Sequence, residues 1–279
     1  MAIQVVRTIA EMKKLRRKCK GSVGLVPTMG YLHEGHLELV RRAKAENPVA
    51  VATIFVNPTQ FAPSEDFKSY PRDLDRDLAL LEKVKTDIVF APADGEMYSD
   101  GYDTWVEVRG ITSKLEGRSR PTHFQGVTTV CNKLFNIIEP HRAYFGQKDA
   151  QQSIVIQKMV ADLNMNLEIV VCPTVREKDG LAMSSRNTYL TAEERPSAPV
   201  LYKSLCLAKD MYGRGERDAA VIKKAMHELI SAVPAARIDY ISIADTGALD
   251  EVEVIRGRTL ISLAVRLGKP RLIDNIILE

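Results

Sequence analysis

The sequence predicts an α/β fold in which a Rossmann-like, doubly wound parallel sheet is followed by a smaller C-terminal α+β domain. Up to about residue 175, short apolar runs alternate with segments whose apolar residues recur at helical spacing. Residues 49–56 (VAVATIFV) are apolar without alternation, as expected for a strand covered on both faces of a parallel sheet. After Val175 this regular succession stops, which predicts a domain boundary there.

The first predicted domain, residues 1–175, contains strands and helices in turn. Within one helix, for example, Leu74, Leu78 and Leu81 recur every three or four positions. The predicted strands cover residues 22–26, 49–56, 87–91, 142–145 and 167–171. The predicted helices cover residues 36–47, 73–85, 125–138 and 148–163. Such a succession is typical of a doubly wound sheet.

The second predicted domain, residues 176–279, begins with a polar, glycine-containing stretch over 176–187, which predicts a mobile loop. Two helices are expected over 196–212 and 217–233, separated by Gly213-Arg-Gly215. Three β-rich stretches, at 238–243, 259–265 and 271–278, close the chain. Helices followed by strands in this order predict a small α+β domain.

The composition predicts a cytoplasmic protein without a nucleic acid or membrane partner. The 39 basic residues are nearly balanced by 36 acidic ones, so no clearly basic domain favours nucleic acid binding. No apolar run approaches the roughly 20 residues that span a bilayer, and no signal-peptide core follows Met1. The four cysteines lie far apart, with neither C-x-x-C pairs nor metal-ligand spacing.

Residues 27–36 (PTMGYLHEGH) occupy the first strand-to-helix turn and predict a nucleotide site. The spacing of Gly30 and Gly35 resembles a P-loop, but the Lys-Ser/Thr pair is absent. A helical H-E-x-x-H zinc motif places its histidines four residues apart, whereas His33 and His36 are three apart. We therefore favour the HxGH type of the class I synthetases and nucleotidylyltransferases, in which imidazoles at a helix N-terminus bind triphosphate oxygens.

Two further segments support a nucleotide site. Met183-Ser-Ser-Arg186 resembles the KMSKS loop of the same superfamily and would follow the departing pyrophosphate. Phe145-Gly-Gln-Lys-Asp149 lies at another strand-to-helix turn, where Lys148 can reach phosphate oxygens. Because ligands of doubly wound sheets collect at the carboxyl ends of the strands, both strand-to-helix turns are expected at one edge of the sheet.

Six segments in order resemble the pantoate–β-alanine ligase family, within the HIGH-motif nucleotidylyltransferase superfamily. They are PTMGYLHEGH (27–36), IFVNPTQF (54–61), YPRDLDRDL (70–78), RPTHFQGV (120–127), FGQKDAQQ (145–152) and REKDGLAMSSRNTYL (176–190). The resemblance implies ATP-dependent condensation of (R)-pantoate with β-alanine, through a pantoyl adenylate, to give pantothenate, AMP and pyrophosphate. It also implies Mg²⁺ entering with ATP, no tightly bound organic cofactor, and a homodimer formed through the large domain.

The resemblance also implies the site residues. His36 would donate a proton, and the catalytic set would be completed by His33, Lys148, Ser184, Ser185 and Arg186. The expected ATP contacts are Met29, Gly30, Tyr31, Leu32, His33, Glu34, Gly35, His36, Gly146, Gln147, Lys148, Asp149, Val175, Met183, Ser184, Ser185 and Arg186. The expected acid and amine contacts are Gln60 and Gln152 for pantoate, Asn57 and Gln60 for β-alanine, and Arg120 and His123 lining the pocket. Tyr31 and Gln147 depart from the family's commonest pattern, in which a small residue and Glu are frequent.

Three other functions stay open at the level of sequence. An adenylyl transfer to a phosphorylated acceptor would call for more cations than the glutamine-bearing segments NPTQF and KDAQQ offer. A class I aminoacyl-tRNA synthetase would need a tRNA-binding domain that this 279-residue chain does not evidently contain. A nucleotide-sensing module would bind ATP without any turnover that depends on an acid substrate.

Overall fold

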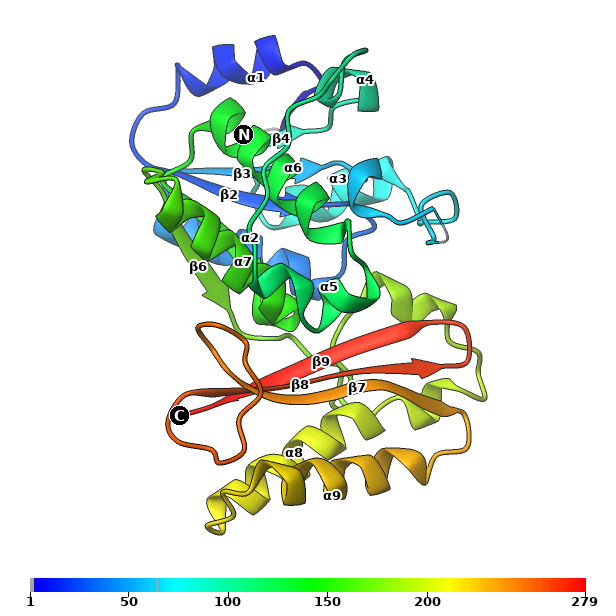
Figure 1. Ribbon diagram of the computed structural model, residues 1–279. Coiled ribbons are helices and arrows are strands. Elements are labelled where there is room, and N and C mark those ends of the chain that lie inside the picture. The colour runs from blue at the N-terminus through cyan, green and yellow to red at the C-terminus, as the bar shows by residue number, and fades with distance from the viewer. Residues whose placement is uncertain (1–2, 64) are drawn as a thin grey trace. The chain divides into compact units, whose positions relative to one another are not determined.

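A six-stranded parallel sheet forms the centre of the first part of the chain in the computed structural model, which describes residues 3–63 and 65–279 (Figure 1). Its strands are β1 (Gln4–Val6), β2 (Val23–Thr28), β3 (Val49–Ile54), β4 (Ile88–Phe90), β5 (Arg142–Gly146) and β6 (Glu168–Cys172). Their spatial order is β1-β4-β3-β2-β5-β6, and every neighbouring pair is parallel. From β2 the chain proceeds through β3 and β4 on one side, then through β5 and β6 on the other. The order therefore reverses between β2 and β5, where doubly wound sheets bind their ligands.

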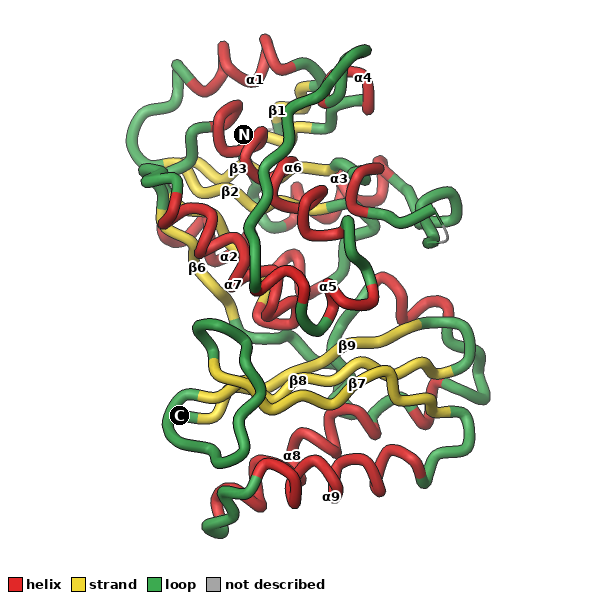
Figure 2. Tube along the Cα trace, in the orientation of Figure 1, coloured by secondary structure: helices red, strands yellow, loops and turns green. Residues whose placement is uncertain are grey.

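Helices flank this sheet, which confirms the predicted fold class. They are α1 (Ile9–Arg16), α2 (Glu34–Glu46), α3 (Leu74–Lys83), α4 (Asp94–Met97), α5 (Glu116–Ser119), α6 (His123–Ile138) and α7 (Ala150–Asp162). The apolar residues of α2, including Leu37, Val40 and Ala43, are buried in one cluster with Val26 and Ala52 of the sheet. Figure 2 shows the long connection between α4 and α5, most of which is neither helix nor strand.

The second part of the chain is the predicted α+β domain. Strands β7 (Ala236–Asp245), β8 (Thr259–Leu267) and β9 (Arg271–Leu278) form an antiparallel sheet in that order. Helices α8 (Val200–Gly213) and α9 (Ala219–Ser231) pack on one face of it (Figure 1). Leu205 of α8 and Met226 of α9 are fully buried in one apolar cluster with Leu263 and Val265 of β8.

The two compact units do not divide the chain at a single point. The first comprises Met1–Gly146 and Gln151–Pro173, and the second comprises Gln147–Ala150 and Thr174–Glu279. Residues 147–150, which the sequence placed in the Rossmann-like domain, are thus grouped with the second unit. They include a 3₁₀ turn, Gln147–Asp149, so the helix predicted from residue 148 begins at Ala150.

Two elements at the start of the chain were missed by the sequence patterns. Strand β1 has three residues, too few to show a period. Met12 is the buried residue of helix α1, and the basic residues around it leave no clear apolar period in the sequence. The predicted loop over 176–187 also has internal structure, because Arg176 pairs with Ala182 in a β-bridge and a 3₁₀ helix covers Ser185–Tyr189.

Candidate active site

The turn that follows β2 has an unusual backbone. β2 ends at Thr28, and both Gly30 (φ +81°) and Tyr31 (φ +48°) adopt the left-handed conformation. Glycine accepts this conformation readily, whereas a residue with a Cβ needs support from its surroundings. The Thr28 hydroxyl begins that support, because its oxygen accepts the Gly30 N–H at 3.2 Å while it donates to the Thr53 carbonyl at 2.6 Å.

The carboxylate of Asp77 on α3 completes the support of this turn. It accepts the N–H groups of Tyr31 and Leu32, each at 2.7 Å, and its side chain is 1% exposed. Burial raises the pKa of Asp77, while these two hydrogen bonds and Arg76 act to lower it. Arg76 also donates to the Leu32 carbonyl at 2.9 Å and places its guanidinium 4.7 Å from the centre of the Tyr31 ring. The sequence patterns assigned no role to either residue, because an Arg-Asp pair on an amphipathic helix is usually a solvated one.

The two histidines of the turn lie together at the start of α2. His33 is the N-cap residue, and the His36 Nδ1 accepts the His33 N–H at 3.3 Å. Their ring centroids are 4.0 Å apart. A neutral His36 that accepts at Nδ1 carries its proton on Nε2, so it can donate from Nε2. Glu34, in the first turn of α2, forms an ion pair with Arg41 at 2.5 Å. Its carboxylate therefore neutralises less of the partial positive charge at the N-terminus of the helix.

A second group of predicted residues forms a buried amide cluster. The Gln60 Nε2 donates to the Met29 Sδ at 3.1 Å, so the turn after β2 directly contacts the NPTQF segment. The Asn57 Nδ2 donates to the Gln60 Oε1 and to the Gly126 carbonyl, and its Oδ1 accepts from the hydroxyls of Thr59 and Tyr98. Every polar atom of the Asn57 side chain is therefore engaged within the protein.

Gly126 of α6 makes this cluster possible. A Cβ at that position would lie 2.6 Å from the backbone nitrogen of Gln60, closer than real Cβ contacts. The missing side chain lets the 3₁₀ segment Pro58–Gln60 lie against the helix, with its main chain in contact. Tyr98, which the sequence reasoning missed, joins the same cluster through Asn57.

The RPTHF segment lies against the main chain of Gln60. Both the Arg120 Nη2 (3.2 Å) and the His123 Nδ1 (2.9 Å) contact the Gln60 carbonyl, so a neutral His123 carries its proton on Nδ1. Arg120 also forms a two-point ion pair with Glu65. Burial, with a smaller contribution from the Arg120 charge, lowers the pKa of His123 to about 4.

The two adjacent glutamines of α7 differ in what they can do. The side chain of Gln151 is fully committed, because it accepts the Glu116 N–H and donates to the carbonyls of Ile111 and Lys114. Gln152, the predicted pantoate contact, is half-buried in the same first turn. The pattern Gln-Gln in the sequence could not separate these two roles.

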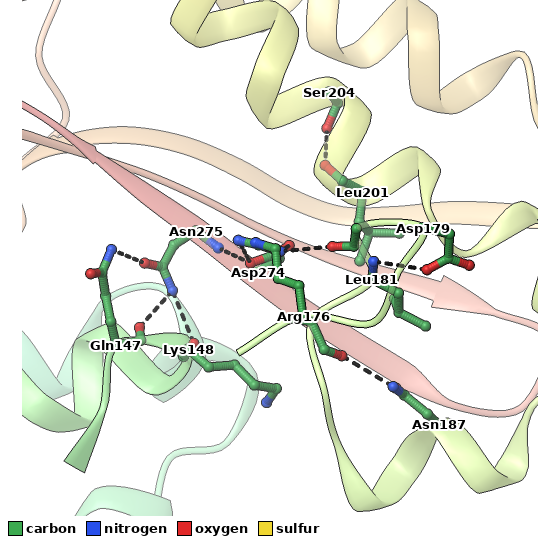
Figure 3. Close-up of polar contacts among 12 residues, drawn as sticks. Gln147, Lys148, Arg176, Asp179, Leu181, Asn187, Leu201, Ser204, Asp274 and Asn275 are labelled. Atoms are coloured by element: carbon green, nitrogen blue, oxygen red, sulfur yellow. Dashed lines mark hydrogen bonds and ion pairs between the residues drawn. The ribbon is translucent and has the colours of Figure 1, made fainter. Parts of the chain in front are cut away.

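Gly146, the last residue of β5, belongs to the first unit, whereas the predicted residues at 147–149, Val175 and 183–186 belong to the second. Figure 3 shows Gln147 and Lys148 of this second group. Lys148 lies 3.6 Å from the Asp149 carboxylate within the 3₁₀ turn. The Met183 N–H donates to the Val175 carbonyl at 3.0 Å, and the Ser184 hydroxyl accepts the Arg186 N–H at 3.3 Å. The predicted site residues are therefore distributed over both units, and the printed contacts join Met29 to Gln60 in the first and Val175 to Met183 in the second.

Residues 3–63 and 65–279 contain no group of three or more His, Cys, Asp or Glu side chains arranged to hold a metal ion. In the same described part of the chain, no helix is both long and apolar enough to cross a membrane.

Known proteins resemble this chain along nearly its whole length. The model of a family described as Pantoate-beta-alanine ligase matches residues 4–277. A pantothenate synthetase of Roseiflexus sp. (strain RS-1) is 58% identical over 277 residues, which cover 99% of this chain and 100% of the relative. A pantothenate synthetase structure from Thermus thermophilus has a TM-score of 0.94 and 48% identity, with 98% of each chain covered. A Francisella tularensis pantoate-beta-alanine ligase, complexed with beta-gamma ATP and beta-alanine, has a TM-score of 0.81 and 34% identity, covering 99% of this chain and 98% of its own.

Removing the Asp77 carboxylate is expected to destabilise the protein. In Asp77→Ala the buried Leu32 N–H and the part-buried Tyr31 N–H lose their acceptor, and an unsatisfied buried donor costs about 1–3 kcal/mol. Urea unfolding should therefore show a loss in that range or above. Asp75→Ala, at an exposed position of the same helix, should stay within about 0.5 kcal/mol of wild type. Equal stability of the Asp77 and Asp75 variants would contradict the role of Asp77.

The lowered pKa of His123 predicts a pH dependence of stability. Between about pH 6.5 and pH 4 the unfolded chain binds a proton that the folded chain does not, so the free energy of unfolding falls as pH falls. The contribution is about 1.4 kcal/mol per pH unit inside this window. Urea unfolding from pH 7.5 to 4.5 should show a shallower decline for His123→Gln than for wild type. His227→Gln, exposed on α9, should follow wild type, and parallel curves for all three proteins would disprove the prediction.

Proposed function

The chain belongs to the pantoate–β-alanine ligase family, and from this premise we propose that it condenses (R)-pantoate with β-alanine to pantothenate, converting ATP to AMP and pyrophosphate. The contact between Met29 and Gln60 is the observation that supports this most. It joins the nucleotide-type turn to a neutral, buried amide instead of a cation. A neutral amide both donates and accepts, which suits a hydroxylated acid better than a phosphorylated acceptor.

The proposed first half-reaction forms pantoyl adenylate. An oxygen of the pantoate carboxylate attacks the α-phosphorus of ATP, and the bond to the bridging oxygen breaks as pyrophosphate leaves with the electron pair. The protein has to hold the reactants in line and neutralise charge on the phosphates. The proton on His36 Nε2 would be donated to a phosphate oxygen, with His33 beside it at the same helix end. Lys148 would contact the α-phosphate, and Ser184, Ser185 and Arg186 would contact the β- and γ-phosphates.

In the proposed second half-reaction, the β-alanine amine attacks the acyl carbon of the adenylate and AMP leaves. The buried cluster around Gln60 would exclude water that would otherwise hydrolyse the mixed anhydride. Asn57 is the expected β-alanine contact, but its amide is engaged at every polar atom. We therefore assign it chiefly to orienting Gln60, whose Oε1 it holds at 3.2 Å. The β-alanine in the Francisella tularensis relative supports the choice of amine.

Mg²⁺ is proposed as part of the substrate, entering with ATP. Phosphate oxygens and water would supply most of its ligands, as is usual for this ion. The side chains at both groups of site residues are mainly imidazole, ammonium, guanidinium, hydroxyl and amide, which suit phosphate oxygens better than magnesium. The family resemblance further supports a cytoplasmic homodimer formed through the first unit.

Pyrophosphate–ATP exchange tests the proposed reaction. Purified protein should exchange labelled pyrophosphate into ATP only when pantoate is present, and the exchange should not require β-alanine. The reason is that adenylate formation is reversible and precedes entry of the amine. A related acid without the 2-hydroxyl group serves as the control and should support little exchange. Folded protein that shows no exchange with pantoate would disprove the ligase assignment, and exchange without any acid would indicate a different adenylyl transfer.

Variants of His36 and Lys148 test the proposed phosphate contacts. Removing one positioned donor from a transition state typically lowers the rate by about 10²- to 10³-fold. We expect His36→Ala and Lys148→Ala each to slow exchange by that factor. His227→Ala on α9 and Lys158→Ala, which pairs with Asp162 on α7, are matched controls and should exchange at the wild-type rate. An unchanged rate in either site variant would remove that residue from the catalytic set.

A further inference from the structure

The turn that carries Lys148 is held by a residue 127 positions further along the chain. The Asn275 Nδ2 on β9 donates to the carbonyl oxygens of both Gln147 and Lys148, each at 2.9 Å (Figure 3). Its Oδ1 lies 3.4 Å from the Gln147 Nε2. Asn275 is 3% exposed, so these bonds lie away from water. The side-chain amide nitrogen of Asn275 thus donates both of its hydrogen bonds to main-chain carbonyls of the 3₁₀ turn.

Asp274, the neighbouring residue of β9, binds Arg176, which begins the segment that leads to Met183–Arg186. Successive side chains of a strand point to opposite faces, and Asp274 lies on the face opposite Asn275. Its carboxylate accepts two hydrogen bonds from Arg176, at 2.6 and 3.0 Å, and also the Asn275 N–H at 2.8 Å. The Arg176 guanidinium is 3.8 Å from the Tyr202 ring centre, which fixes it further.

Arg176 begins the short hairpin that leads to Met183–Arg186. It donates to the Gly180 carbonyl at 3.1 Å and pairs with Ala182 in a β-bridge, directly before Met183. One pair of adjacent residues on β9 is therefore connected by hydrogen bonds to both segments, the Lys148 turn and the hairpin. The Asn275 N–H to Asp274 carboxylate bond joins the two connections.

We propose that Asn275 is a positioning residue that fixes the direction of Lys148, and that the Arg176–Asp274 pair fixes the Met183–Arg186 loop to the same strand. The inference rests on the proposed ligase function and concerns how its cations are held. Two donated hydrogen bonds set the orientation of the peptide planes on either side of the Lys148 Cα, and hence the direction in which its side chain leaves the turn. A displacement of about 1 Å in a positioned group lowers a rate by as much as 10²-fold.

A graded set of Asn275 variants tests this role in the exchange assay. Asn275→Ala removes both donors and should lower kcat for exchange by about 10- to 100-fold, with a much smaller change in KM for ATP. Asn275→Ser retains one hydroxyl donor and should fall between the alanine variant and wild type. Should the alanine variant fail to fold, the serine variant carries the test. Asn136→Ala, at an exposed position of α6 whose amide donates to Asn132 of the same helix, is the control and should match wild type.

A double-mutant cycle separates positioning from a general loss of structure. If Asn275 acts through Lys148, then Asn275→Ala in a Lys148→Ala background should lower kcat further by less than about twofold. A purely structural role would instead lower kcat by the same factor in both backgrounds, and that outcome would overturn the inference. An Asn275→Ala protein within about twofold of wild type would overturn it as well. Wild-type protein without pantoate-dependent exchange would disprove the proposed function itself, so the two failures are distinguishable.

Discussion

The buried carboxylate of Asp77 is the constraint on which the first group of site residues depends. It accepts hydrogen bonds from two N–H groups of the turn in which Tyr31 adopts the left-handed conformation, which a non-glycine residue seldom adopts without such support. This turn redirects the chain from β2 into α2, and only then does His33 become the N-cap, with His36 in the first turn of the helix. The placement of the two imidazoles thus depends on Asp77, although its hydrogen bonds go to Tyr31 and Leu32, which precede the histidines.

The predicted site residues differ in chemistry between the two units. The imidazoles of His33 and His36 and the neutral amides lie in the first unit, where Gln60 and His123 are buried. The ammonium of Lys148 and the guanidinium of Arg186 are carried by the second unit. In the proposed reaction, the groups that would hold the acid are needed in both half-reactions, while the cations would act chiefly in the first.

Much of the fold followed from local pattern, and much of the site did not. The apolar run at β3 and the helical spacing of Leu74, Leu78 and Leu81 were enough to predict a doubly wound sheet. A strand that is buried on both faces is apolar at every position, whereas a helix that is buried on one face is apolar at every third or fourth position. The segment 27–36 predicted the first strand-to-helix turn because its glycines and histidines directly follow an apolar strand and precede a helical apolar pattern. Asp77 and Asn275 act over 45 and 127 residues, and no local period marks such contacts. Gln151 and Gln152 are identical in sequence terms and differ only in their neighbours.

The grouping of residues 147–150 with the second unit has a consequence for how this chain can be divided or recombined. A fragment that ends at Pro173 would keep Lys148 but lose Asn275. A fragment from Thr174 onward would keep Asn275 but lose the turn whose carbonyls it binds. The two units are therefore compact without being separable modules. In chimaeras between relatives, the 147–150 turn and strand β9 would have to be inherited together, although a large part of the chain lies between them.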